Sequence, residues 1–184
     1  FMSRPVAGAV GAHVFITLGS GDRERPLKLN YPYDQQVENR FYAFIDRPYL
    51  QDDEFDLKAR QTINLDGDTL VNAAQGLASG AVITDYDGWY IDLLDRGEQV
   101  VNQSAIGGGY VFFNTFQPDG GGAGMCANLG AAKAYRVPLF SPENDLGQKF
   151  GEGIPIPPII VTVDLDSNGS SCFGAGCGSG EVTE

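Results

Sequence analysis

One short segment near the end of the chain has the residue types and spacing of a calcium loop. Asp164, Asp166 and Asn168 alternate with other residues and are followed by Gly169, which is the D-x-D-x-N-G opening of an EF-hand-like loop. The alternation can turn three side-chain oxygens onto one cation, and the glycine permits a sharp bend. The twelfth position holds Ala175 instead of the usual bidentate acid. We therefore predict calcium at Asp164, Asp166 and Asn168, with a metal-free Asx-rich turn as the alternative. A weaker candidate loop spans residues 64–68.

The three cysteines, Cys126, Cys172 and Cys177, are candidates for a disulfide. A zinc site is disfavoured, because the chain has one histidine and no CxxC motif. A bridge could join Cys172 to Cys177, or Cys126 to either of them. The odd count leaves one thiol, whose partner could lie outside this chain. Cysteine usage thus favours an oxidising compartment.

No catalytic constellation stands out. His13 is the only histidine, and its neighbours Ala12 and Val14 place it in an apolar strand, so we expect a structural histidine. Carboxylates are plentiful, but nothing selects one pair for glycoside hydrolysis. Trp89 and Tyr90 could stack on a sugar ring, although their strand-like setting favours a place in the core. We predict that the protein is not an enzyme.

Composition excludes several classes of partner. The 184 residues carry a formal net charge of -12, with 24 acidic and 12 basic side chains. This balance argues against nucleic acid and against anionic lipid surfaces. No apolar run approaches the roughly 18 residues that would cross a bilayer. Phe1 precedes Met2, so we expect a processed product or an excised piece of a longer protein.

The elements that must position these residues are almost all strands. The only helix candidate is Val71–Leu77. Short segments rich in β-branched and aromatic residues, bounded by Gly, Pro, Asp and Asn, predict an all-β protein. The predicted strands are His13–Leu18, Arg40–Ile45, Trp89–Leu94, Gln99–Asn102, Tyr110–Phe116, Lys133–Val137 and Ile159–Val163.

A weak internal repeat refines the fold class. The strand and turn at residues 13–24 recur about 97 positions later at residues 110–122, and the strand at 39–46 is similar to the segment at 133–147. A third strand begins near residue 159. Units of several strands favour a β-propeller, of which this chain would hold two to three blades. A plain β-sandwich with a coincidental likeness is the alternative.

The predicted domain is a single one over residues 1–184. Long insertion loops cover about 19–38 and 46–80, and a Gly- and Cys-rich tail covers 164–184. The insertions could be binding loops, or they could be solvent-exposed loops with no binding role. A partial propeller would expose sheet edges and an apolar face. We therefore expect the remainder of the propeller, or another chain, to complete it.

Several motifs, in order along residues 8–163, resemble the C-terminal propeller of PilY/PilC-type proteins of bacterial type IV pili. They are the Gly-Ser-Gly turn at 19–21, Tyr-Ala-Phe-Ile-Asp at 42–46, Gly-Trp-Tyr-Ile-Asp-Leu at 88–93, Gly-Glu-Gln-Val at 97–100, Val-Phe-Phe-Asn-Thr-Phe-Gln-Pro at 111–118 before Cys126, and Gly-Ile-Pro-Ile-Pro-Pro at 153–158.

The resemblance implies a secreted, non-enzymatic module at the pilus tip or the outer cell surface. Such a module would take part in pilus assembly or adhesion, with minor pilins or other filament components as partners. Two alternatives remain open at this point. One is a carbohydrate-binding β module that uses Trp89, Tyr90 and the acidic insertion. The other is a quinoprotein-like propeller enzyme.

Overall fold

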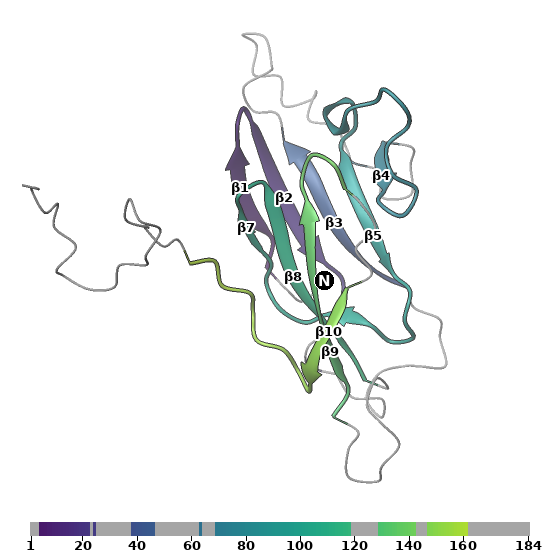
Figure 1. The fold of residues 1–184 in the computed structure, drawn as a ribbon, viewed down its shortest axis with the longest axis vertical. Helices are drawn as coiled ribbons and strands as arrows, with labels where there is room; N and C mark the ends of the chain where they lie inside the picture. The colour runs from purple at the N-terminus through teal and green to yellow at the C-terminus, as the bar shows by residue number, and fades with distance from the viewer. Residues whose placement is uncertain are drawn as a thin grey trace, which may run out of the picture.

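The computed structural model describes residues 4–22, 24, 38–46, 63, 69–118, 129–142 and 147–161. Within these ranges the regular structure is β, apart from one short 3₁₀ turn, so the predicted all-β class is confirmed (Figure 1). The same ranges contain no helix that is long and apolar enough to cross a membrane. The elements are β1 Val6–Val10, β2 His13–Gly19, β3 Asn39–Asp46, β4 Leu70–Asn72, η2 Ile83–Asp85, β5 Gly88–Leu93, β6 Gln99–Val100, β7 Ala105–Gly107, β8 Tyr110–Gln117, β9 Ala131–Pro138 and β10 Gln148–Glu152.

The first sheet has the strand order β1-β2-β3-β5-β4. Strands β1, β2, β3 and β5 run antiparallel in sequence order, and the short β4 adds to β5 in parallel. A tight turn at Gly11 and Ala12 joins β1 to β2, and the positive φ of 64° at Gly11 suits a glycine. The result is a four-stranded meander with one added edge strand.

The second sheet repeats this plan. Strands β8, β9 and β10 are again antiparallel neighbours in sequence order, and both β6 and β7 pair with the other side of β8. A two-residue turn at Gly108 and Gly109 joins β7 to β8. Strand β8 therefore takes the place of β2, and β9 takes the place of β3. These are the pairs of segments that the sequence repeat relates.

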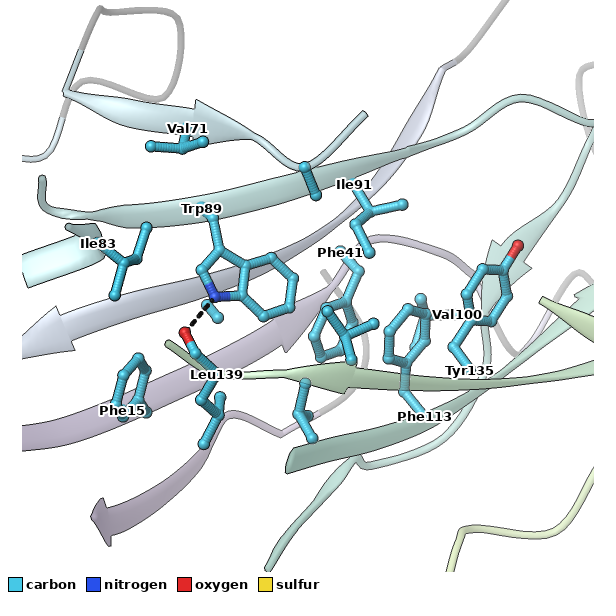
Figure 2. Packing of buried hydrophobic residues seen from close by; sticks show 14 of the residues in the cluster. Phe15, Phe41, Val71, Ile83, Trp89, Ile91, Val100, Phe113, Tyr135 and Leu139 are labelled. Atoms are coloured by element: carbon cyan, nitrogen blue, oxygen red, sulfur yellow. Dashed lines mark hydrogen bonds between the residues drawn. The ribbon is translucent and has the colours of Figure 1, made fainter. Parts of the chain in front are cut away.

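The two sheets pack face to face around one hydrophobic core (Figure 2). The ring of Phe41 in the first sheet stacks on Phe113 in the second, with centroids 3.8 Å apart, and Phe113 stacks on Tyr135 at 4.6 Å. Trp89 is fully buried, and its indole Nε1 donates a hydrogen bond of 3.0 Å to the carbonyl oxygen of Leu139. Because the side chains of this core come from both sheets, their packing fixes how the two sheets lie against each other.

Two predicted elements differ from the structure. Val71–Leu77 is not a helix: its first residues belong to β4, which pairs with β5, and the Oδ1 atom of Asn72 then accepts a bond from the amide of Ala74 in a turn. Residues 159–161, the described part of the predicted strand Ile159–Val163, belong to no strand. The loop boundaries also shift, because Gly19 ends β2 and residues 70–72 form β4.

Candidate functional site

The residues predicted to hold calcium or to form a disulfide lie outside the described ranges. This applies to Asp164, Asp166 and Asn168, to the weaker loop at residues 64–68, and to the cysteines Cys126, Cys172 and Cys177. In the part of the chain that the structure describes, no group of three or more His, Cys, Asp or Glu side chains could hold a metal ion. The calcium and disulfide predictions therefore stay predictions.

His13 lies in a structural setting at the start of β2. It pairs with Val10 across the hairpin turn, is half-buried, and faces the ring of Phe140 at a centroid distance of 6.1 Å. Its Nδ1 atom is buried without a hydrogen-bond partner. The surroundings are aromatic and apolar, as expected for a structural histidine.

Trp89 and Tyr90 point to opposite faces of β5. Trp89 is in the core, as its sequence setting indicated, and presents no ring to a ligand. Tyr90 is half-buried, with the guanidinium of Arg40 4.8 Å from its ring centroid. Arg40 also forms an ion pair of 2.5 Å with Asp92, the acid of the Gly-Trp-Tyr-Ile-Asp-Leu block. On one face of β5 this block therefore contributes Trp89 to the core, and on the other face Tyr90 and Asp92 hold the guanidinium of Arg40.

The most concentrated buried polar chemistry in the described residues surrounds Glu98. Its side chain is almost fully buried just before β6. One carboxylate oxygen accepts hydrogen bonds from the Thr115 hydroxyl at 2.5 Å and the Tyr135 hydroxyl at 2.7 Å. The other accepts from the Lys133 ammonium at 2.9 Å, and Lys133 also pairs with the more exposed Asp95. We call these five residues the Glu98 cluster.

The electrostatics of the Glu98 cluster keep Lys133 and Tyr135 protonated. Burial raises the pKa of Tyr135, and the charge of Glu98 raises it further, so the phenol stays protonated. Burial lowers the pKa of Lys133, but its hydrogen bonds to Asp95 and Glu98 outweigh this effect, and the net pKa is above 10.5. Lys133 and Tyr135 therefore remain protonated hydrogen-bond donors, and neither is suited to act as a base or a nucleophile.

The Glu98 cluster joins strands that are distant in sequence. It connects the entry to β6 with Thr115 on β8 and with Lys133 and Tyr135 on β9. The backbone carbonyl of Glu98 also accepts a bond of 2.9 Å from the side-chain amide of Asn39 on β3. A buried carboxylate whose oxygens are all hydrogen-bonded fixes the positions of the strands that supply the donors. We therefore assign the Glu98 cluster a structural role.

The Gly-Ser-Gly turn after β2 lies next to the Glu98 cluster and ties the two sheets together. The carbonyl oxygen of Ser20 accepts a bond from the amide of Val100 at 2.9 Å, and the amide of Asp22 donates to Oε1 of Gln99 at 2.8 Å. A Cβ atom at Gly19 would lie 2.4 Å from the Val100 side chain, and one at Gly21 would lie 2.3 Å from the Val100 carbonyl oxygen. Glycine is required here because β6 approaches so closely.

Sequence reasoning did not single out the Glu98 cluster. Its only local signal is a charged residue directly before the predicted strand Gln99–Asn102, inside the Gly-Glu-Gln-Val motif at 97–100. Its partners on β8 and β9 carry no distinguishing pattern in the sequence. The chain matches no family model, no curated protein and no solved structure in the three comparisons made.

Proposed function

We propose that this chain is a non-enzymatic surface module of the PilY/PilC type, which acts in pilus assembly or adhesion outside the cell. Its partners would be minor pilins or other filament components. The two sheets would be successive blades of a β-propeller, a rigid frame from which the inserted loops reach a partner.

One observation carries this proposal: the described motifs of the resemblance lie on or directly beside the strands of two sheets with a similar strand order. Strands β1, β2, β3 and β5 repeat as β7, β8, β9 and β10. Adjacent propeller blades are four-stranded antiparallel sheets that pack face to face, with their first strands side by side around the axis. In Figure 1 β1 and β7 lie beside each other, which is compatible with this proposal.

The buried position of Trp89 gives no support to the carbohydrate-binding alternative, which needs an exposed aromatic platform. The quinoprotein-like alternative has a simple test, because a bound redox cofactor would give the purified protein a visible absorbance band. We assign the module to binding.

We also propose calcium as a ligand of Asp164, Asp166 and Asn168, on the strength of their D-x-D-x-N-G spacing. Added Ca²⁺ should then raise the melting temperature, and chelation should reverse the rise. The double variant Asp164→Asn/Asp166→Asn should abolish the response. A melting curve unchanged by Ca²⁺ and by chelator would rule the site out.

The function itself is tested by capture of pilins. The chain is immobilised and exposed to purified minor pilins and, separately, to the major pilin of a type IV pilus. We expect retention of a minor pilin and none of the major one. Gly19→Val, which disrupts the junction of the sheets, should lose retention, whereas Leu94→Lys on the surface should keep it. Failure of every minor pilin to bind the folded chain contradicts the proposal.

A further inference from the structure

The chain that follows β10 is held on the outer face of the second sheet by two asparagine side chains. The side-chain amide of Asn102 donates a hydrogen bond to the carbonyl oxygen of Pro155, and that of Asn114 donates one of 2.8 Å to the carbonyl oxygen of Ile156. Residues of β8 alternate between the core and the outer face, and Asn114 belongs to the outer set. We call residues 154–158 the proline strap.

The proline strap leads from one edge of the second sheet toward the other. It begins just after β10, and the chain beyond it reaches β7, where Ile160 lies against Gly107. An added Cβ at Gly107 would be 2.7 Å from Cδ1 of Ile160, so a glycine makes room for the isoleucine. Strands β10 and β7 lie on opposite sides of β8. In Figure 1 this part of the chain is the yellow-green trace that leaves β10 and runs toward β7.

The three prolines of the strap explain why it is attached through its carbonyl groups. Pro155, Pro157 and Pro158 have no backbone N–H to donate, and a proline keeps the residue before it extended. Such a segment lacks the donors for a β ladder, whereas its carbonyl oxygens remain available. In the part of the chain that the structure describes, the strap belongs to no strand. Its attachment therefore depends on side chains of the sheet beneath it.

This attachment is weak in comparison with the strand pairing below it. Ile154 and Ile156 are 45% and 73% exposed, and Pro155 between them is buried. Asn102 is 3% exposed, and its Oδ1 atom is buried without a hydrogen-bond partner among the described residues. The closed strap thus leaves this amide half satisfied, a cost that opening removes because water can then reach the oxygen. A segment with few buried apolar contacts and no ladder of its own opens locally.

We propose that the proline strap is a cover that opens and closes over Asn102 and Asn114 as one unit while the two sheets stay folded. In the closed state the strap occupies both amide donors. In the open state the donors face solvent on a sheet that keeps its shape. The device goes beyond the proposed function, because it depends only on contacts between the strap and the second sheet.

The test follows hydrogen exchange by NMR on the 184-residue chain. It compares the side-chain amide protons of Asn102 and Asn114 with the backbone amides of β8 and β9. We expect the two side chains to exchange with the same opening free energy, which lies below that of the backbone amides. Low concentrations of urea should leave the side-chain exchange unchanged, because a local opening exposes little surface.

A set of proline variants tests the strap itself. Pro155→Gly/Pro157→Gly/Pro158→Gly gives the open strap more conformational freedom, so exchange at both asparagines should become about tenfold faster or more. Pro5→Gly, at an exposed site before β1, is the matched control and should leave both rates unchanged. Backbone exchange in β8 and β9 should stay the same in both variants.

A reciprocal effect between the two asparagines is the sign of a single opening unit. Asn114→Ala removes one of the two bonds and should make exchange at Asn102 about threefold to tenfold faster, and Asn102→Ala should do the same at Asn114. The proposal is overturned if the two side chains exchange only together with the backbone of β8, if the proline variant has no effect, or if neither asparagine responds to loss of the other. These measurements involve no pilin, so the two proposals fail separately.

Discussion

At the residue scale, Glu98 is a buried charge whose compensation depends mainly on Lys133. Lys133→Met would leave the carboxylate buried with only two hydroxyl donors. We expect it to lower the free energy of unfolding by about 3–5 kcal/mol, the range found when one partner of a buried pair is removed. Denaturant unfolding measures the change, with Lys149→Met, at an exposed site on β10, as the control.

A double variant tests whether the loss of stability in Lys133→Met comes from the unpaired charge of Glu98 or from the changed packing at residue 133. Lys133→Met/Glu98→Gln removes the unpaired charge and should recover part of the lost stability. If the double variant is no more stable than Lys133→Met, the loss does not arise from the buried carboxylate.

The Glu98 cluster also predicts a loss of stability at alkaline pH. The folded-state pKa of Tyr135 is raised above its ordinary value of 10.0, so above about pH 10 the unfolded chain releases a proton that the folded chain retains. Lys133, raised above 10.5, acts in the same direction. The stabilisation is complete below pH 10 and falls as pH rises, at about 1.4 kcal/mol per pH unit for each retained proton.

Tyr135→Phe isolates the tyrosine contribution. It should cost about 1–3 kcal/mol at neutral pH, since Glu98 loses a donor, and should make the decline above pH 10 shallower. Urea unfolding at pH 7, 9, 10 and 11 measures both effects. An unchanged slope in the variant would show that Tyr135 does not titrate with unfolding.

At the element scale, the strands with strong side-chain patterns could be predicted and the weak ones could not. Strands β2, β3, β5 and β8 are rich in aromatic and β-branched residues that alternate between the core and the outer face. Strand β9 carries the core residues Tyr135 and Val137 two positions apart. Strand β1, with the sequence Val-Ala-Gly-Ala-Val, and the polar β10 were missed, because their places come from pairing with β2 and β9. Val71–Leu77 is predicted as a helix and yet begins in β4, because the pairing of β4 with β5 is not local.

The Glu98 cluster was missed for a related physical reason. Its members come from the loop before β6 and from β8 and β9, and only the register of β8 with β9 brings Thr115 opposite Lys133. The Gly-Ser-Gly turn was recognised as a turn. Its contact with β6 of the other sheet depends on how the layers pack.

The close contact between β2 and β6 can be tested by adding a methyl group at Gly19 and then shortening the side chain that it meets. Gly19→Ala should lower the unfolding free energy by about 1–3 kcal/mol, because the new methyl group meets the Val100 side chain. Gly19→Ala/Val100→Ala should recover part of this loss, since the obstacle is a side chain. Thermal and denaturant unfolding of the four combinations give the coupling energy.

Gly88→Ala is the matched comparison. There the obstacle is the carbonyl oxygen of Ala43, 2.0 Å from an added Cβ, and the φ of 139° also disfavours alanine. No side-chain truncation can relieve a backbone clash, so we expect a larger loss that no second variant restores. Rescue of Gly88→Ala by truncating a neighbouring side chain would contradict this geometry.

At the scale of the whole molecule, the shared core makes the two sheets one cooperative unit. The stacked rings of Phe41, Phe113 and Tyr135 run from the first sheet into the second, and Trp89 bonds to the backbone beyond β9. Among the residues that the structure describes, one cluster of buried side chains draws on both layers.

This coupling predicts how damage in one sheet spreads to the other. Phe41→Ala removes a fully buried ring and should cost about 3–5 kcal/mol. Amide exchange should accelerate by a similar factor in β3 and in β8 and β9, although only β3 carries the substitution. In a double-mutant cycle, Phe41→Ala and Phe113→Ala should couple by about 0.5–1.5 kcal/mol. Faster exchange confined to the first sheet would mean that the layers unfold separately and that the shared core does not bind them together.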